Sequence, residues 1–355
     1  MILTHRPMQP EDVPECVKIM ASHPVFGPHY GRDINLLPDA WLRLLQSEAK
    51  ITAVFCAGEG PRTTIVGTGV TAIVRDDFLC DLKTPPHFWI GPELARRIVK
   101  GESPLLTGKQ LRDDNARGGL NAVCWEASTR AGYEADVELH RYIMKAFIQD
   151  HQGYCWKEAV SSIAGPDHLK WMLNMGGFFW DPLAGGYTCT LRDDPGEIAA
   201  RPHVIGITRD LEINRRQEDW VGGSIGAIFD YRPPILGFSG SEQSLLSCAL
   251  SGATDEHLAE MRGTSLSTVK KMWISIYTRV EDACPELISD SLQTELPTNG
   301  RGTEKRRRLL AYLREHPEEL LPVSRKLLSQ SAKAADGKGS AIAFIEETRK
   351  RRGSL

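Results

Sequence analysis

The chain has 355 residues, of which 41% are hydrophobic and 25% are charged, and its formal net charge is −3. Such a length suits two or three domains, and such a composition excludes a fibrous or wholly disordered chain. No apolar run reaches the roughly 18 residues of a membrane span, and the N-terminus lacks a signal-peptide core. The sequence therefore predicts a cytoplasmic protein with no membrane contact.

Residues 1–195 mix strand-like and helix-like segments. Segments 50–59 and 63–74 are rich in β-branched residues, and the Gly-Pro-Arg between them predicts a hairpin. Further strands are predicted at 119–129, directly after Gly177 and at 184–191. Helical spacing at 135–151 predicts an amphipathic helix that buries one broad face, made of Val137, Leu139, Ile143, Met144, Phe147 and Ile148. This order of elements predicts an α+β domain with a largely consecutive sheet.

Two segments of this half are less regular. Residues 75–118 are rich in Asp, Pro and Gly and are interpreted as an insertion, and a short helix is expected to end at Gly176-Gly177. Residues 196–237 contain strand-like runs and are interpreted as a linker region, which Pro233-Pro234 closes.

Three short helices are predicted between Glu242 and Val280. Gly252 stops the first helix, Thr254 caps the second, Gly263 makes a turn, and Ser265 caps the third. The third helix has a continuous apolar seam at Leu266, Val269, Trp273, Ile276 and Val280. Its other side carries polar residues, so the pattern predicts a helix-turn-helix with DNA contacts from Ser265, Ser267, Thr268, Lys270, Lys271 and Arg279.

About 40 residues of this stretch resemble the LuxR-type DNA-binding domain of bacterial transcription regulators. The resemblance is carried by Glu242, Leu245-Leu246, Gly252, Leu258-Ala259, Gly263, Ser265, Thr268-Val269-Lys270 and Ile276-Tyr277. The sequence departs from the family pattern at His257, which removes a capping-box partner, and at Arg262 and Thr264. The turn before the third helix is therefore expected to pack differently or to be covered by another part of the chain. The resemblance implies binding to double-stranded DNA as a homodimer, with pairing through the segment that holds Leu287, Ile288 and Leu292.

The C-terminal part is basic and helical. Residues 301–355 carry 14 Lys and Arg and 7 Asp and Glu, a net charge of +7, so the first 300 residues carry −10. Two more amphipathic helices are predicted, divided near Pro317. The densest basic run is Lys305, Arg306, Arg307 and Arg308, which is interpreted either as a solvated helix face or as a set of phosphate contacts.

The order of elements in residues 1 to about 192 resembles the GNAT acyltransferase fold. That family binds acyl-CoA through a Gly-rich turn that opens a helix, and here only Arg130 and Gly132 match the turn, with the wrong spacing. Leu173 stands where family members often have a Tyr proton donor. Glu126 is the remaining candidate base, or a structural residue. We therefore expect a GNAT-like sensor or scaffold without catalysis, in which Glu126 and Arg130 mark a candidate ligand pocket.

The predicted domains are a GNAT-like domain at 1–195, the linker region at 196–237, a helix-turn-helix domain at 238–296 and a basic helical extension at 297–355. Together they indicate a transcription regulator with a small-molecule effector as a further partner. No cofactor is expected, with acyl-CoA or another small acyl ligand as the alternative. The spacing of His and Cys predicts no metal site. Two other functions stay open: an active acyltransferase with an accessory DNA-binding domain, and an autoinducer-type receptor with a PAS- or GAF-like ligand domain.

Overall fold

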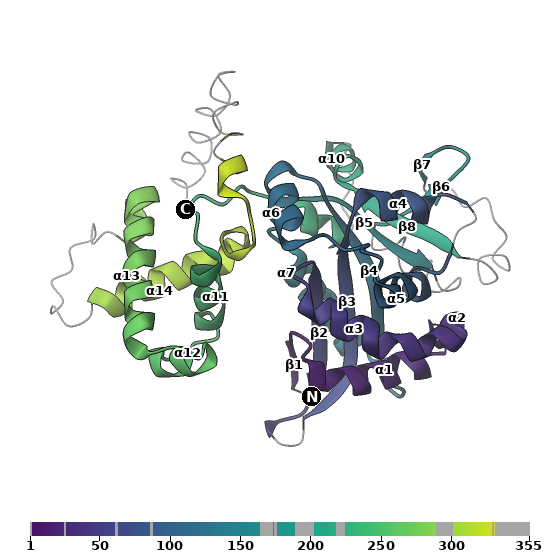
Figure 1. The fold of residues 1–355 in the computed structure, drawn as a ribbon, viewed down its shortest axis with the longest axis horizontal. Coiled ribbons are helices and arrows are strands. Elements are labelled where there is room, and N and C mark those ends of the chain that lie inside the picture. Colours follow the sequence, from purple (N-terminus) through teal and green to yellow (C-terminus); the bar gives the residue numbers. More distant parts are fainter. Residues whose placement is uncertain are drawn as a thin grey trace. The chain divides into compact units, whose positions relative to one another are not determined.

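The computed structural model describes residues 2–24, 26–60, 63–85, 88–163, 173, 176–188, 202–217, 224–288, 301–328 and 330. The chain divides into two compact units, Met1–Asp230 and Tyr231–Leu355, and each is described by itself (Figure 1). The first unit mixes helices with a sheet, and the described elements of the second unit are all helical. The predicted α+β class is therefore confirmed.

An eight-stranded mixed sheet forms the centre of the first unit, in the order β1-β2-β3-β4-β5-β8-β6-β7. Its strands are β1 Leu3–Arg6, β2 Lys50–Ala57, β3 Thr64–Val74, β4 Leu120–Thr129, β5 Trp156–Ile163, β6 Phe178–Asp181, β7 Gly186–Thr188 and β8 His203–Thr208. β4 and β5 are parallel, and the other described pairs are antiparallel. β2 and β3 form the predicted hairpin.

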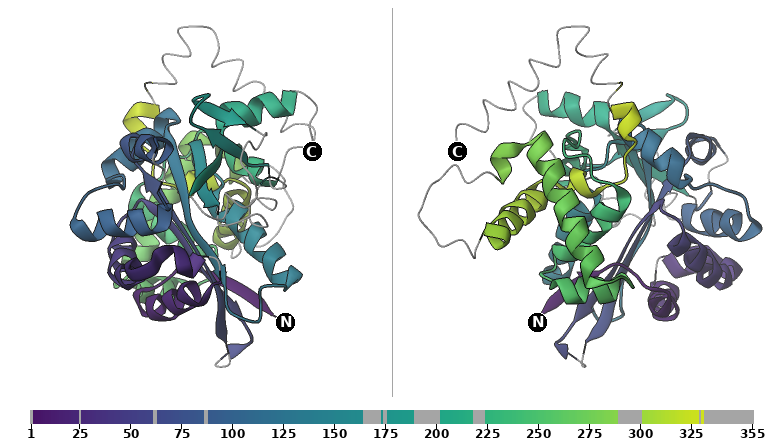
Figure 2. Two further views of the ribbon diagram at one scale, coloured as in Figure 1. Left: turned by 90° about the vertical axis from the view of Figure 1, so that its right-hand side faces the viewer. Right: turned by 60° about the vertical axis from the view of Figure 1, so that its left-hand side comes forward.

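Helices cover both faces of this sheet (Figure 2). The larger hydrophobic cluster joins the sheet to helices on one face, with Trp41, Phe78 and Leu94 among its fully buried members. A smaller cluster joins Phe55 and Val66 of the sheet to α7. The helices are α1 Val13–Ser22, α2 Phe26–Tyr30, α3 Leu37–Gln46, α4 Asp76–Lys83, α5 Ile90–Lys100, α6 Gly108–Arg117, α7 Val137–His151 and α10 Arg209–Gln217, with 3-10 turns η1 Pro10–Asp12, η2 Gly31–Leu36 and η4 Ser224–Phe229.

Residues 75–118 differ from the expected insertion. They form α4, α5 and α6, and α5 buries a stripe of apolar residues in the main core: Ile90, Leu94, Ala95 and Ile98. The glycines that suggested loops are helix ends, because Gly101 and Gly118 adopt the left-handed conformation that closes α5 and α6. This segment is therefore part of the body of the first unit.

The expected linker region at 196–237 also differs. Residues 203–208 form β8, which pairs with β5 on one side and β6 on the other. The strand-like run that begins at Ser224 is instead the 3-10 turn η4. The first unit continues to Asp230, and its sheet needs β8 because β6 has no other described link to β5.

Helix α7 forms where it was predicted, but the face that it buries is rotated. Leu139 and Ala146 are buried against the sheet, whereas Val137 is 59% exposed. The contact face therefore follows Leu139, Ile143 and Ala146, at spacings of four and three residues. Ala146 was missed because a small residue adds little to a hydrophobic pattern.

The second unit contains the three predicted helices and a fourth. They are α11 Gly240–Ala249, α12 Asp255–Met261, α13 Leu266–Ala283 and α14 Arg301–Glu315, with short turns η5 Pro285–Leu287 and η7 Pro317–Leu320. One hydrophobic core joins all four helices, and Leu246, Leu258, Ile276 and Leu309 are fully buried in it. The described part of the basic extension thus belongs to this unit.

Candidate nucleic-acid interface

Two helices and a tight turn bring the predicted DNA-contacting residues together. Thr254 caps α12 by accepting from the N–H of His257 at 3.3 Å. At the other end, Gly263 has a φ of +57°, and the N–H of Thr264 donates to the carbonyl of Ala259 at 2.9 Å. Ser265 then caps α13 by accepting from the N–H of Thr268 at 3.2 Å. The predicted caps and turn are confirmed.

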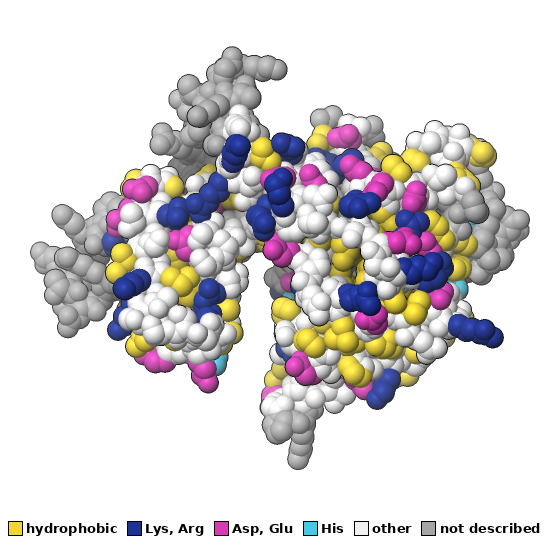
Figure 3. All heavy atoms as spheres, viewed as in Figure 1, with side chains coloured by type: hydrophobic (Ala, Val, Ile, Leu, Met, Phe, Trp, Pro, Cys, Tyr) yellow, Lys and Arg dark blue, Asp and Glu magenta, His cyan; other side chains and the backbone are white. Residues whose placement is uncertain are grey.

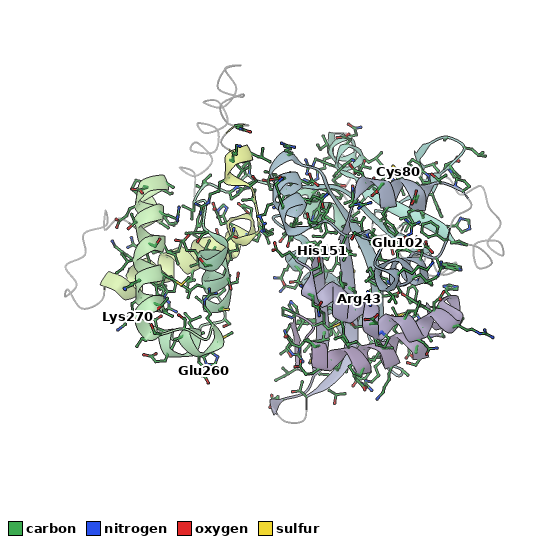
Figure 4. The ribbon with its side chains drawn as sticks, viewed as in Figure 1. Arg43, Cys80, Glu102, His151, Glu260 and Lys270 are labelled. Carbon is green, nitrogen blue, oxygen red and sulfur yellow. The ribbon has the colours of Figure 1, made fainter. Side chains whose placement is uncertain are left out.

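The two sides of α13 differ in polarity. Val269, Trp273, Ile276 and Val280 are buried, as predicted, and Leu266 is half-buried. The opposite side is exposed and carries Ser267, Thr268, Lys270, Lys271 and Ile274. Figure 4 shows Lys270 on α13 and Glu260 on α12. The first two turns of α13 therefore present hydroxyl and ammonium groups to solvent.

The three hydroxyl residues at the start of α13 form one cluster. The Ser265 hydroxyl lies 2.8 Å from that of Ser267 and 2.9 Å from that of Thr268. All three residues are exposed, so the Ser267 and Thr268 hydroxyls keep room for a further partner. Ser265 thus caps the helix, and its neighbours hold polar groups beside the N–H groups of the first turn.

Arg279 was predicted to contact DNA, and in the structure its half-buried side chain also pairs with a carboxylate of its own unit. Its Nε donates to both carboxylate oxygens of Glu242 on α11, at 3.2 and 3.0 Å. Ser275 donates to the same carboxylate at 2.8 Å. Glu242 is buried, so this contact fixes α13 against α11. Arg279 therefore has a packing role, and its predicted contact with DNA stays a prediction.

The environment of Glu242 keeps it ionised. Burial disfavours the charge, but hydrogen bonds from Ser239, Ser275 and Arg279 outweigh burial, and the pKa of Glu242 is held below its usual range. Ser239 and Glu242 also form the capping box of α11. The Glu242 carboxylate thus accepts from the backbone N–H of Ser239 at the start of α11 and also neutralises the charge of Arg279.

The basic run of α14 is paired with acidic side chains of the same unit. Lys305 lies 2.9 Å from Glu281, and Arg307 and Arg308 both contact Glu304, at 2.7 and 2.9 Å. These two arginines lower the pKa of Glu304 to about 2. On the face seen in Figure 3, basic and acidic side chains of this unit are interspersed. The geometry therefore favours the interpretation as a solvated, salt-bridged face.

Arg306 has a packing role. Its guanidinium lies 4.5 Å from the centre of the Trp273 ring and donates to Asp255 at 2.7 Å. The indole N–H of Trp273 donates to the same carboxylate at 3.1 Å. Asp255, Trp273 and Arg306 thus join α12, α13 and α14.

Ile288, one of the residues predicted to pair two copies of the chain, lies in the core of its own unit. Its side chain is 1% exposed and packs in the core of its own unit, and Leu287 packs against the same core. A partner could contact the Ile288 side chain only if that side chain left the core, and the loss of its burial would cost stability. Ile288 is therefore not available for a dimer contact. Leu292 lies outside the described residues.

Glu126, the candidate ligand-binding residue of the first unit, is enclosed by side chains. Tyr30 from α2 donates its hydroxyl to one carboxyl oxygen in a short hydrogen bond, and the Trp125 indole donates to that hydroxyl at 2.9 Å. The other carboxyl oxygen is buried with no hydrogen-bond partner. Burial raises the pKa of Glu126 to about 8. Tyr30 was missed because it lies 96 residues from Glu126.

This cluster lies where two parallel strands separate. The pairing of β4 with β5 covers Leu120–Val123 and ends at Val160, although both strands continue. Ligands often bind at such a separation near the carboxyl ends of parallel strands. Here Glu126 contacts Tyr30, whose hydroxyl also accepts from Trp125, and a methyl group on Gly91 would clash with the tyrosine oxygen. Side chains therefore fill the immediate surroundings of Glu126.

The loop after β4 is also satisfied internally. Arg130 contacts Glu15 at 2.5 Å and the Ile65 carbonyl at 2.7 Å. The N–H of Gly132 donates to the Glu134 carboxylate at 2.7 Å. Asp136 caps α7 by accepting from the N–H of Leu139 at 2.9 Å. Carboxylates thus occupy donors that a phosphate would need, and Arg130 and Glu126 do not contact each other.

Among the described residues, no three His, Cys, Asp or Glu side chains are placed to hold a metal ion. None of the described helices has both the length and the apolar character needed to cross a bilayer. Comparison with known proteins found no matching family model and no matching curated protein.

Proposed function

We propose that the chain is a sequence-specific DNA-binding transcription regulator in which the second unit reads DNA. One observation carries the proposal: a capped helix, a glycine turn and a second capped helix expose Ser267, Thr268, Lys270 and Lys271 on one side of α13. This arrangement supports the resemblance to LuxR-type domains, whose second helix of the motif enters the major groove.

The chemistry of α13 suits that position. Its 18 residues extend about 27 Å at 1.5 Å per residue, and an α-helix fits the width of the major groove. Lys270 and Lys271 provide the positive charge for phosphates or guanine edges. The core side of the helix is fixed by Trp273 and by the contact between Arg279 and Glu242, so the outer side is presented rigidly.

For the first unit we propose a GNAT-like scaffold or sensor without acyl transfer. The order of helices and strands along the chain supports the GNAT-like resemblance. Two observations argue against catalysis: Glu126 is enclosed by Tyr30 and Trp125, and carboxylates occupy the loop before α7. A general base needs access to the substrate proton, which this enclosure removes.

Homodimerisation is part of the proposal. A helix-turn-helix protein commonly uses two copies, whose half-sites are one helical turn or about 34–36 Å apart. Segment 238–280 is formally neutral, with four basic and four acidic residues, so this segment by itself gains little from counterion release. The pairing surface excludes the buried Ile288.

Charge reversal tests the DNA contact. We expect Lys270→Glu with Lys271→Glu to abolish DNA binding in a fluorescence-anisotropy assay, because two attractions become repulsions. The matched control is Lys109→Glu with Lys145→Glu, which changes the net charge equally at two exposed positions of the first unit. Thermal unfolding should be unchanged in both variants. If the α13 variant binds DNA like the control, the proposed interface is wrong.

A further inference from the structure

The outer side of α13 carries one large apolar residue. Ile274 is 66% exposed, which is the highest value among the large hydrophobic residues described in the second unit. It follows Lys270 and Lys271 by four and three residues, so all three lie on one face of the helix. Single exposed apolar residues are common on proteins, but this one lies among the proposed DNA contacts.

The helix geometry places Ile274 within reach of a base edge. Ser267, Lys271 and Ile274 are separated by four and three residues and form one row along the helix. Ile274 lies about 10 Å further along the axis than Ser267, at 1.5 Å per residue. If the first turns of α13 contact DNA, Ile274 therefore faces the groove one to two base pairs away from the contacts of Lys271.

The chemistry of the row limits what it can recognise. Asn and Gln are the usual readers of adenine, and neither occurs in α13. The one arginine, Arg279, is held by Glu242. The thymine C5-methyl is the apolar group on the base edges of the major groove, and an aliphatic side chain is its natural partner.

We propose that Ile274 contacts a thymine methyl group and sets a preference for thymine at one position of each half-site. This inference rests on the proposed function. Lys270 and Lys271 supply the attraction to DNA, and Ile274 supplies discrimination, because burying a methyl group against an apolar side chain favours thymine over the other bases.

The test removes the methyl group from the DNA and the side chain from the protein. Full-length protein first selects bound duplexes from a random library, and each thymine of the selected half-site is then replaced by deoxyuridine, which lacks the methyl. We expect one replacement to weaken wild-type binding about four-fold, since a buried CH₂ is worth about 0.8 kcal/mol. Ile274→Ser should lose the preference for thymine there and should not respond to deoxyuridine.

The control variant is Met261→Ser, which removes an exposed apolar side chain that precedes the turn before α13. It should keep both the selected sequence and the response to deoxyuridine. Deoxyuridine that changes nothing, with an Ile274→Ser variant that selects the wild-type sequence, overturns the inference and leaves the proposed function standing. Failure of the wild type to bind any duplex overturns both.

Sedimentation of the same variants distinguishes another use of Ile274. If Ile274→Ser converts an oligomer to a monomer while base preference is retained, the residue is a self-association contact and the inference is overturned. An unchanged oligomeric state together with a changed base preference supports the thymine contact.

Discussion

Glu126 shows how the surroundings of a buried carboxyl can give it a structural role. It is fully enclosed, its neighbour Tyr30 has a pKa raised well above its usual value, and both groups are therefore neutral at pH 7. A neutral pair can share a hydrogen bond without burying a charge. The residue type alone suggested a base, but the surroundings favour a packing role.

This environment predicts that the stability of the first unit depends on pH. The pKa of Glu126 is about 8 in the folded chain against 4.5 for a glutamate in water, so the unfolded chain releases this proton at lower pH. Stability from the raised pKa is present below about pH 4.5 and is lost as the pH rises towards 8. We expect Glu126→Gln, which cannot ionise, to gain roughly 3 kcal/mol relative to wild type between pH 5 and pH 8.

Calorimetric unfolding of both proteins across this pH range gives the measurement. Glu138→Gln is the matched control, because Glu138 is an exposed glutamate that pairs with Arg141 on the surface of α7. The difference in unfolding free energy between Glu138→Gln and wild type should stay nearly constant with pH. A constant difference for Glu126→Gln as well would contradict a buried, neutral carboxyl.

At the scale of single elements, the turn between α12 and α13 decides where the outer side of α13 points. Gly263 lies in the left-handed region, where side chains other than glycine are strained. A methyl group added there meets no atom within 4 Å, so the cost of Gly263→Ala is purely conformational. We expect this variant to lower the stability of the second unit by about 1 kcal/mol.

Gly240→Ala is the control for this prediction. Gly240 begins α11, has no positive φ and also has open space around it. Alanine is a better helix former than glycine, so Gly240→Ala should leave stability unchanged or raise it slightly. If denaturant titration shows equal losses of stability for the two variants, the left-handed conformation of Gly263 is not the cause of the destabilisation.

Elements with local signals were predictable from the sequence, and those that depend on distant partners were not. Thr254, Gly263 and Ser265 were identified because caps and turns need particular residues at particular positions. β8 was left in a linker because its neighbours, β5 and β6, are fixed by the whole sheet. Helices α4 to α6 were missed because their Gly and Pro residues resemble loop composition.

The site shows the same division. Lys270 and Lys271 follow from the apolar seam, since residues opposite a buried stripe are exposed. Arg279 also lies outside the apolar seam of the helix, but it pairs with Glu242, which is 37 residues away in the sequence. The helix pattern alone does not reveal such a distant partner. Ile288 was assigned to a partner because an apolar residue near a surface helix fits a dimer contact and a core equally well.

At the scale of the whole molecule, the C-terminal segment completes the second unit. The Glu319 carboxylate accepts from the N–H groups of Ile235 and Leu236 at 2.9 and 3.0 Å, which ties η7 to the segment before α11. Leu309 and Leu313 of α14 are buried in the shared core. The basic extension and the helix-turn-helix are therefore one folding unit in the described residues.

Two truncations separate the charge of this segment from its packing role. Residues 331–355 lie outside the described residues and carry six basic and three acidic side chains, a net charge of +3. Their deletion leaves α14 and η7 in place, so we expect the thermal unfolding of the second unit to be retained. DNA affinity should fall for specific and random duplexes alike, with a flatter salt dependence, because counterion release is independent of sequence.

Deletion of residues 301–355 should have a different effect. It removes Leu309, Leu313 and Glu319, and each buried leucine that is lost costs about 2–5 kcal/mol even as a change to alanine. Because a domain is stable by only about 5–15 kcal/mol, the second unit should unfold and sequence-specific binding should disappear. If this protein instead keeps its sequence preference and loses only salt-sensitive affinity, α14 is a separable basic arm, and the shared core does not hold the interface together.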